Sequence, residues 1–378
     1  MNFLAQRSRE VLRKREEAGL VRTARTWRSD GETVNLADND YLGLAAHPEV
    51  KEAAAEAIER YGCSSSAAPS VTGFRPPHEA LVNRLAAWYG ANSDQVMLWN
   101  SGYSANHAIL GMLPEKGHLV LADRFVHHSM LAGVLASGAR LCRYPHLDLD
   151  QLETVLREHP SEKAIFVITE TVFGMDGDLP DLHHLVGLRE QYGFALVVDE
   201  AHALGWYGKR GAGLAEQEDI LKHVDILVGT LGKALGSQGA YAVFREPVVK
   251  HRLENFAGEY VYSTYLAPAN AAAASKAIDL VESFVPERPA WRKSACSFRE
   301  ELETEGLKTI SGDSPVVPVV LGEAEIVLRA AENLERDGVK VAAIRPPTVP
   351  EGTARLRLSL KAELSLAGLA NRVADAAK

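Results

Sequence analysis

The chain has 378 residues, of which 46% are hydrophobic and 24% are charged, and its formal net charge at pH 7 is -9. This length and composition are typical of a globular protein with one large core and a smaller second one. The net negative charge disfavours nucleic acid and anionic membrane surfaces as partners.

The cysteines and the N-terminal residues bear on where the protein works. Cys63, Cys142 and Cys296 are scattered and lack the spacing of metal ligands, which favours a reducing compartment, so we expect a cytoplasmic protein. Residues 3–17 place four apolar side chains among charged ones, which predicts a short amphipathic helix. We expect no signal peptide and no membrane-spanning segment, because no apolar run has the necessary length.

Residues 34–89 alternate between regular elements and polar loops. Polar and apolar residues alternate over residues 34–44 and stop at a glycine, which predicts a short strand entering a loop. Residues 48–61 and 77–89 begin at prolines and predict helices. The loop between them, residues 62–73, consists of small residues, so either a flexible surface loop or a ligand contact would fit.

From residue 96 onward, strand and helix patterns alternate. Apolar runs predict strands at residues 96–99, 119–122, 164–169, 194–198, 226–228 and 241–244. Helical patterns occupy residues 104–112, 128–136, 151–157 and 182–191. This order predicts an α/β fold with a mostly parallel sheet covered by helices on both faces. Ligands of such folds bind at the carboxyl ends of the strands.

Two predicted strand ends carry residues that suit one cofactor. Asp199 ends the strand at residues 194–198 and is followed by His202, while Lys233 follows the next strand within a run of small residues. Pyridoxal 5'-phosphate needs an amine for a Schiff base, a carboxylate for its pyridine nitrogen and a donor for its phenolic oxygen. Lys233, Asp199 and His202 could fill these roles in that order.

Other strand ends supply weaker candidates. Residues 100–104 form a glycine turn that opens a helix, where free backbone N–H groups could bind a phosphate. His127 and His128 follow the strand at residues 119–122, and either ring could stack on the cofactor. The acidic turn at residues 175–178 has too few oxygen ligands for a calcium loop, so we expect no metal site.

The C-terminal part alternates again and predicts a small α+β domain. Its expected elements are a strand at residues 314–321, a helix at 323–337, a strand at 339–344 and a last helix at 363–377. We therefore expect an N-terminal segment of residues 1–45, a large domain of residues 46–280 and a small domain of residues 281–378.

Several motifs together resemble the α-oxoamine synthase family, whose members are pyridoxal-phosphate enzymes of the aspartate-aminotransferase fold, fold type I. The matching segments are residues 39–44 (NDYLGL), 199–202 (DEAH), 230–233 (TLGK), 262–264 (YST) and 344–358 (IRPPTVPEGTARLRL). The last segment is the most specific and is most similar to the biotin-pathway branch of the family. The resemblance covers nearly the whole chain from about residue 39.

The resemblance implies a role for each matching position. Lys233 would be the Schiff-base lysine, Asp199 the partner of the pyridine nitrogen, His202 the contact of the phenolic oxygen and His127 the stacking ring. Thr264 would reach the phosphate from the neighbouring subunit, which implies a homodimer with shared active sites. The other implied cofactor contacts are Ser101, Gly102, Tyr103, Glu170 and Thr230.

The resemblance also implies the reaction and its substrates. Arg357, assisted by Asn39, would hold the carboxylate of the amino acid, since a guanidinium pairs with both carboxylate oxygens. Arg345 and Thr348 would be further substrate contacts. The implied reaction is the decarboxylative condensation of L-alanine with pimeloyl-CoA or a pimeloyl acyl carrier protein, in biotin biosynthesis.

Two departures and three alternatives accompany this interpretation. Residues 64–70 replace a glycine-rich loop of the family with Ser and Ala, so the loop path and its acyl-donor contacts could differ. Gly174 stands where a serine is common in the family, so one hydroxyl near the cofactor would be missing. The alternatives are a glycine-using family member (glycine C-acetyltransferase or 5-aminolevulinate synthase type), an aminotransferase, and a catalytically silent subunit. Retention of Lys233, Asp199 and His202 argues against the last.

Overall fold

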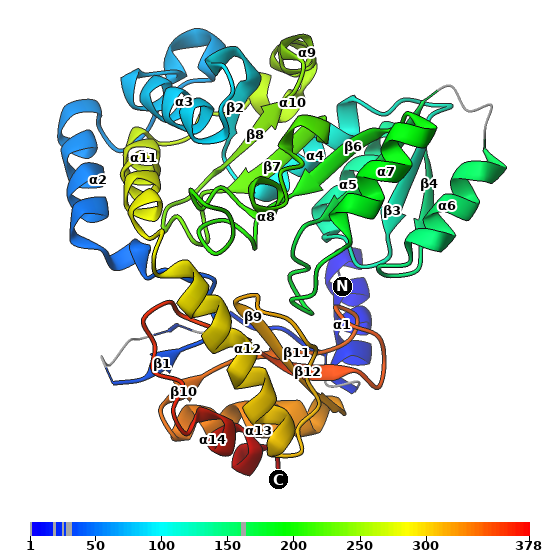
Figure 1. The fold of residues 1–378 in the computed structure, drawn as a ribbon, viewed down its shortest axis with the longest axis vertical. Coiled ribbons are helices and arrows are strands. Elements are labelled where there is room, and N and C mark those ends of the chain that lie inside the picture. The colour runs from blue at the N-terminus through cyan, green and yellow to red at the C-terminus, as the bar shows by residue number, and fades with distance from the viewer. Residues whose placement is uncertain (1, 18–19, 25, 28–31, 160–163) are drawn as a thin grey trace.

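The computed structural model describes residues 2–17, 20–24, 26–27, 32–159 and 164–378. Its centre is a seven-stranded sheet with the strand order β2-β8-β7-β6-β5-β3-β4, in which only β8 runs antiparallel to its neighbours (Figure 1). This confirms the predicted α/β fold with a mostly parallel sheet. The strands are β2 (Val96–Trp99), β3 (Leu119–Asp123), β4 (Arg140–Tyr144), β5 (Ile165–Glu170), β6 (Ala195–Asp199), β7 (Ile226–Thr230) and β8 (Ala240–Phe244).

Helices cover both faces of this sheet, because successive side chains of a strand point to opposite faces. In β6, Leu196 and Val198 belong to one hydrophobic cluster, whereas Val197 belongs to another. The first cluster includes residues of α3 (Pro76–Tyr89), α7 (Leu182–Tyr192) and α11 (Pro268–Ser283). The second includes residues of α4 (Gly102–Met112), α5 (His128–Ser137) and α9 (Pro247–Phe256).

A second, smaller body lies below the large sheet in Figure 1. Its antiparallel sheet has the order β11-β12-β9. The short strand β1 (Val34–Asn35) pairs in parallel with β10 (Val339–Lys340), so the N-terminal segment is joined to this body. The other elements here are β9 (Val316–Gly322), β11 (Ala342–Ile344), β12 (Ala354–Ser359), α12 (Arg288–Thr304), α13 (Ala324–Arg336) and α14 (Leu369–Ala377).

The remaining helices lie around the two bodies. α2 (Pro48–Tyr61) packs against α11, and both appear at the left of the large body in Figure 1. α1 (Phe3–Glu17) buries none of its residues, and Phe3 and Leu4 are exposed. The other helices are α6 (Leu149–Glu158), α8 (Leu214–Gln217) and α10 (Gly258–Val261). No helix in the described ranges is long and apolar enough to cross a membrane.

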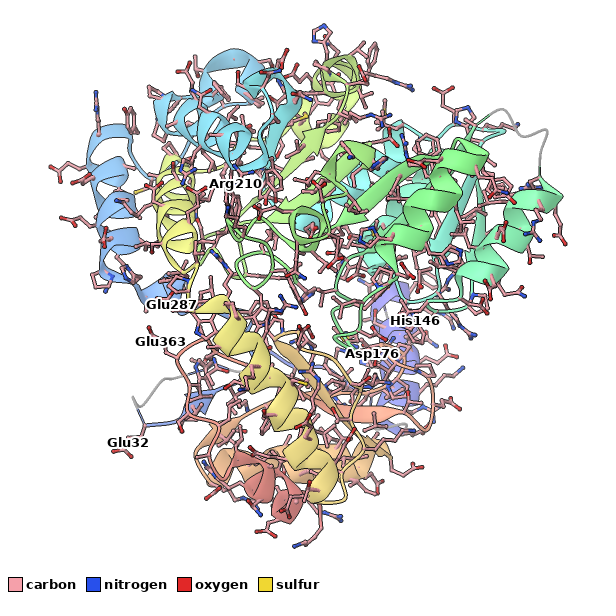
Figure 2. All side chains as sticks on the ribbon, viewed as in Figure 1. Glu32, His146, Asp176, Arg210, Glu287 and Glu363 are labelled. Atoms are coloured by element: carbon pink, nitrogen blue, oxygen red, sulfur yellow. The ribbon has the colours of Figure 1, made fainter. Side chains whose placement is uncertain are left out.

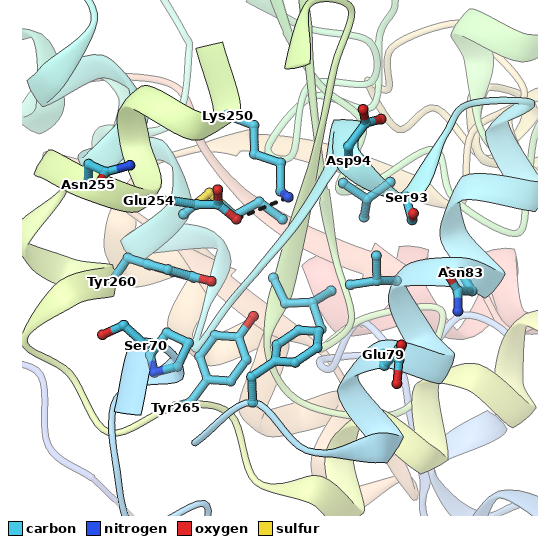
Figure 3. Close-up of a pocket in the computed structure, with 16 residues that line it drawn as sticks. Ser70, Glu79, Asn83, Ser93, Asp94, Lys250, Glu254, Asn255, Tyr260 and Tyr265 are labelled. Atoms are coloured by element: carbon cyan, nitrogen blue, oxygen red, sulfur yellow. Dashed lines mark ion pairs between the residues drawn. The ribbon is translucent and has the colours of Figure 1, made fainter. Parts of the chain in front are cut away.

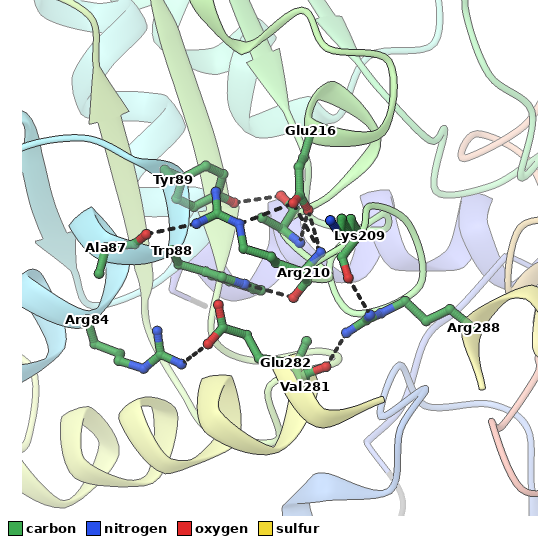
Figure 4. A network of polar contacts seen from close by, with 11 residues as sticks. Arg84, Ala87, Trp88, Tyr89, Lys209, Arg210, Glu216, Val281, Glu282 and Arg288 are labelled. Carbon is green, nitrogen blue, oxygen red and sulfur yellow. Dashed lines mark hydrogen bonds and ion pairs between the residues drawn. The ribbon is translucent and has the colours of Figure 1, made fainter. Parts of the chain in front are cut away.

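Arg288 ties the two bodies together near the start of α12. Its guanidinium donates to the carbonyls of Gly205 at 3.1 Å and Lys209 at 3.0 Å, and also to the carbonyl of Val281 near the end of α11 (Figure 4). Arg288 is 4% exposed, and these carbonyls replace the water it loses on burial. The loop at residues 205–213 is thereby fixed against both α11 and α12.

The predicted elements agree with the structure in the large sheet and less well at its edge and at the C-terminus. The six predicted strands correspond to β2, β3, β5, β6, β7 and β8, whereas the edge strand β4 was not expected. The predicted strand at residues 339–344 was wrong as one element, because β10 and β11 pair with different strands. The last helix begins at Leu369, not at residue 363. The division at residues 45 and 280 stays a prediction.

Candidate active site

Lys233 and Asp199 lie at the same edge of the large sheet. Asp199 is the last residue of β6, and Lys233 follows the end of the neighbouring strand β7 by three residues. The two strands run in parallel, with Asp199 paired in register with Val228. Because the chain folds back after β7, with the Leu231 N–H donating to the Gly239 carbonyl, Lys233 stays close to this edge.

The amine of Lys233 contacts a buried imidazole. Its Nζ lies 2.7 Å from Nε2 of His202, which is 7% exposed. Burial lowers the pKa of Lys233 to about 8, although the charges of Asp199 and Glu170 act in the opposite direction. With this pKa, a much larger fraction of the amine is neutral and nucleophilic near neutral pH than for an ordinary lysine.

His202 is held in the neutral form. Burial lowers its pKa well below the ordinary value, and the positive charges of Lys233 and Arg357 act in the same direction. Its Nδ1 lies 2.6 Å from the hydroxyl of Tyr41. Gly174 also borders the ring, since a Cβ on Gly174 would lie 2.5 Å from Nε2. His202 therefore fills the space that a side chain at position 174 would need.

A helix on one face of the sheet supports Asp199. The side-chain amide of Asn106 in α4 donates to Asp199 Oδ2 at 2.7 Å, and the N–H of Ala201 donates to Oδ1 at 2.9 Å. Asp199 is only 6% exposed, so these donors stabilise a carboxylate that water reaches poorly. Sequence reasoning missed Asn106, because an asparagine within a helix carries no local sign of such a contact.

Glu170 at the end of β5 joins two loops of the site. Its Oε1 accepts the backbone N–H of His127 at 2.6 Å, and its Oε2 accepts that of Gly174 at 3.3 Å. Burial and the nearby charge of Asp199 together raise the pKa of Glu170 to about 8. His127 itself is exposed at the start of α5, which leaves its ring available to stack on a ligand.

The start of α4, at residues 101–103, has the features of an anion cradle. Ser101 caps this helix by accepting the N–H of Ser104 at 3.1 Å, and the first N–H groups of a helix have no acceptor within it. Thr230 lies alongside, because a Cβ on Gly102 would be 3.8 Å from its Oγ1. Tyr103, in the first turn, is 47% exposed.

Thr264 has no contact through its side chain with these residues in the single chain. Its side chain is exposed, while its backbone carbonyl accepts the amide of Asn100 at 2.7 Å. Asn100 directly precedes the cradle at residues 101–103.

Arg357 enters the site from the small body. It is buried in β12, where its Nη2 donates to Asn39 Oδ1 at 3.0 Å and lies 3.4 Å from the Tyr41 hydroxyl. Because Tyr41 also contacts His202, one polar network connects Arg357 with the amine of Lys233. The structure thus brings Asn39 and Arg357 into contact, and it adds Tyr41, which the sequence did not single out.

Arg345 and Thr348 lie in a neighbouring hollow. They line a cavity of about 350 Å³ together with Arg22 and Met175. The guanidinium of Arg22 donates to Thr348 Oγ1 at 2.6 Å. Arg22 was missed because it stands alone in a polar stretch 326 residues from this partner.

A larger cavity of about 590 Å³ lies beside the edge strand β2 (Figure 3). Glu79 of α3, Glu254 of α9 and Tyr265 are among its lining residues, and none of the predicted site residues is. Among the described residues, no group of three His, Cys, Asp or Glu side chains is arranged to hold a metal ion.

The residues at this sheet edge fit pyridoxal 5'-phosphate. Lys233 would carry the aldehyde carbon, Asp199 would face the pyridine nitrogen, and the start of α4 would hold the phosphate. The Asn106 amide holds the buried Asp199 carboxylate, which would suit a protonated ring nitrogen, and Gly102 has no side chain to fill the space beside Thr230.

Comparisons with known proteins agree with this fit. Residues 31–374 match the family described as aminotransferase class I and II. The 8-amino-7-oxononanoate synthase of Geobacter sulfurreducens is 43% identical over 97% of this chain and 96% of its own length. The 8-amino-7-oxononanoate synthase of Alkalilimnicola ehrlichii is 40% identical over 93% of this chain and 92% of its own length.

Solved structures share the whole architecture. A serine palmitoyltransferase from S. paucimobilis, solved with a PLP–myriocin aldimine, has a TM-score of 0.91 at 26% identity and covers 100% of this chain and 98% of that one. An 8-amino-7-oxononanoate synthase from Francisella tularensis has a TM-score of 0.77 at 28% identity. This match covers 92% of this chain and 96% of that one. The chain therefore belongs to the aminotransferase class I and II family, as a fold-type-I pyridoxal-phosphate enzyme of the α-oxoamine synthase group.

Proposed function

We propose that the protein condenses L-alanine with a pimeloyl thioester of CoA or acyl carrier protein to give 8-amino-7-oxononanoate, free thiol and CO2. Its curated relatives, which are similar to it over nearly their full length, are named for the synthesis of this product. The scattered cysteines favour the cytoplasm as its location.

The polar network from Arg357 through Tyr41 and His202 to Lys233 carries this proposal. An amino acid whose carboxylate pairs with Arg357 would place its amine and Cα near the amine of Lys233. Arg357 is 4% exposed, so its attraction for a carboxylate is weakly screened by water.

Each group then has a defined task. When bound, pyridoxal phosphate withdraws electrons from the Cα of the amino acid. Lys233, whose pKa is about 8, removes the Cα proton as a general base. Asp199 keeps the pyridine nitrogen protonated, because a nearby negative charge favours the charged form. Arg357 holds the carboxylate until the new carbon–carbon bond has formed and the thiol has left, after which CO2 is released.

The hollow beside the site supports the choice of acyl donor. Arg22 and Arg345 place two guanidinium groups around a cavity of about 350 Å³ whose lining also includes Met175 and Ile344. Apolar walls with cationic ends suit an acyl chain that ends in a carboxylate, as the pimeloyl group does.

The test is a reconstitution of pure protein with pyridoxal phosphate, followed by L-alanine and pimeloyl-CoA. We expect stoichiometric release of CoA and CO2 and a product with the mass of 8-amino-7-oxononanoate, and neither glycine nor octanoyl-CoA should replace its counterpart efficiently. The Lys233→Ala variant serves as the control and should release no CoA. Turnover with glycine alone would refute the substrate assignment, and transamination without thiol release would refute the reaction.

A further inference from the structure

The loop at residues 171–178 connects the large body with the small one. The carbonyl of Gly174 accepts Nε of Arg357 at 2.6 Å, and Asp176 forms a buried ion pair with Arg355. The carbonyl of Gly177 accepts the Ser314 hydroxyl at 2.6 Å. The position of this loop therefore determines where Arg357 lies relative to the large sheet.

His146 fastens the far end of the same loop. Its Nε2 donates to Asp178 Oδ2 at 3.0 Å, and its Nδ1 donates to Asp123 Oδ1 at the end of β3 at 2.8 Å. The rings of Phe125 and Phe173 enclose the imidazole, each with its centroid 4.5 Å away. Figure 2 labels His146 and Asp176 at the boundary between the two bodies.

The imidazole is positively charged over the physiological pH range. Burial opposes its charge, but the hydrogen bonds and negative charges of Asp123 and Asp178 raise the pKa of His146 to about 9. Tyr144 of β4 also lies near Asp123, and burial raises its pKa well above its ordinary value, so it stays neutral. His146, Asp123 and Asp178 thus form a clamp in which one cation lies between two carboxylates.

Asp178 depends on this clamp. Its Oδ1 is buried and has no partner among the described residues, while Oδ2 contacts His146. Removing the imidazole would leave a half-buried carboxylate without a cation, and such a group moves toward water. The loop would follow, because the carbonyl of Asp178 accepts the N–H of Phe173 at 3.0 Å, directly before Gly174.

We propose that His146 is a positioning residue that holds the 171–178 loop so that Arg357 can grip the amino-acid carboxylate. The inference rests on the proposed function of Arg357. His146 acts through the carbonyl of Gly174, and it links β3, β4 and the end of β5 to the strand that carries Arg357. Its loss should therefore weaken amino-acid binding more than it slows the chemical step.

The experiment compares the holoenzyme with its His146→Gln variant. The dissociation constant for L-alanine, followed by the absorption of the cofactor, should rise about tenfold, as expected for a lost hydrogen bond to a charged group. The kcat should fall less than KM rises. His183→Gln is the matched control, because His183 pairs with Glu218 on the exposed face of α7 and should leave both values unchanged.

A second readout is the unfolding of the cofactor-free protein. Folding raises the pKa of His146 from about 6.5 to about 9, so the clamp stabilises the protein fully below pH 6.5 and loses this effect as the pH rises through 9. The stability difference between the wild type and His146→Gln should therefore shrink as the pH rises through 9, to the part that comes from packing of the ring. The double variant His146→Gln/Asp178→Asn should recover part of the alanine affinity, because Asp178 then carries no unpaired charge, while Asp123 keeps the N–H groups of Phe125 and Leu147 as donors.

The outcomes separate this inference from the proposed function. If the wild type binds alanine and His146→Gln binds it equally well while being less stable, His146 is only structural and the inference is wrong. If the double variant binds alanine as weakly as the single one, the unpaired Asp178 carboxylate does not cause the loss of affinity, and the inferred route through the 171–178 loop is wrong. If the wild type itself does not bind alanine, the proposed function fails and the inference fails with it.

Discussion

Gly174 shows how one missing side chain can define a site. The resembling family commonly has a serine here, and its absence suggested a lost hydroxyl near the cofactor. In the structure, the ring of His202 occupies the space instead, since a Cβ would lie 2.5 Å from Nε2. That placement brings His202 within 2.7 Å of Lys233. The departure therefore changes packing around the imidazole.

We expect the Gly174→Ala variant to be destabilised by about 1–3 kcal/mol, because a methyl group must displace a buried ring. Gly187 offers a matched control, since it is exposed in α7 and a Cβ there would meet nothing within 4 Å. Gly187→Ala should be stabilised by up to about 1 kcal/mol. Denaturant unfolding of both cofactor-free variants measures the difference. If Gly174→Ala were as stable as the wild type, the space beside His202 could accommodate a methyl group.

Lys233 should capture its cofactor in a pH-dependent way. Only the neutral amine attacks an aldehyde, and burial lowers the pKa of Lys233 to about 8, so the capture rate should rise with pH and level off above 8. The charge of Glu170 opposes this lowering, so the Glu170→Gln variant should reach its plateau at lower pH. Stopped-flow absorption measures both rates. If the capture rate instead reached half of its plateau near pH 10, the pKa of Lys233 would not be lowered by burial.

At the scale of elements, β12 combines packing with recognition. Successive side chains alternate between two faces. Leu356 and Leu358 join the hydrophobic core, whereas Arg355 and Arg357 reach the 171–178 loop through Asp176 and Gly174. Both kinds of side chain are buried, so the arginines depend on these partners.

Removing one charge of the Arg355–Asp176 ion pair should therefore lower the free energy of unfolding more than replacing both residues with apolar ones. Asp176→Asn leaves a buried guanidinium without its counter-charge, and we expect a loss of about 3–5 kcal/mol in the free energy of unfolding. The double variant Asp176→Leu/Arg355→Leu should recover most of this loss, since an apolar pair needs no counter-charge. Denaturant titration compares the two, and a double variant as unstable as the single one would contradict this account.

Sequence patterns were reliable where local periodicity decides the structure. The buried strands of the large sheet are apolar runs, so β2 and its neighbours were predicted within one or two residues. β4 was missed because it lies at the sheet edge and lacks strand periodicity: two partly buried residues separate the exposed Arg140 and Arg143, and only Tyr144 is buried. Strand ends likewise revealed Asp199 and Lys233 as neighbours.

Contacts between distant segments had no such pattern. Asn106 reaches Asp199 from inside a helix, and Tyr41 reaches His202 across 161 residues. Neither position differs locally from an ordinary polar residue of a helix or loop. Which of His127 and His128 faces the site was likewise open from chemistry alone, and the resemblance selected His127.

At the scale of the whole molecule, the surface next to the cradle, around Tyr103 and Tyr262, has the composition of an interface with a second copy of the chain. Tyr262 is 89% exposed and Tyr103 is 47% exposed, and large exposed aromatic side chains are enriched at protein interfaces. The backbone carbonyl of Thr264 accepts the amide of Asn100, which directly precedes the cradle, whereas the side chain of Thr264 is exposed. A homodimer could bring this hydroxyl to the phosphate of the partner's site.

A mixed dimer tests this arrangement. We expect Lys233→Ala and Thr264→Glu to be inactive alone, the second because a carboxylate would repel the phosphate, while Thr264→Ser should stay active. If each site takes Lys233 from one subunit and Thr264 from the other, a mixed dimer has one site with both changes and one with neither. Random mixing of the two variants should then restore about a quarter of wild-type activity. If both residues serve the same subunit's site, every site of the mixed dimer carries one change and activity stays absent.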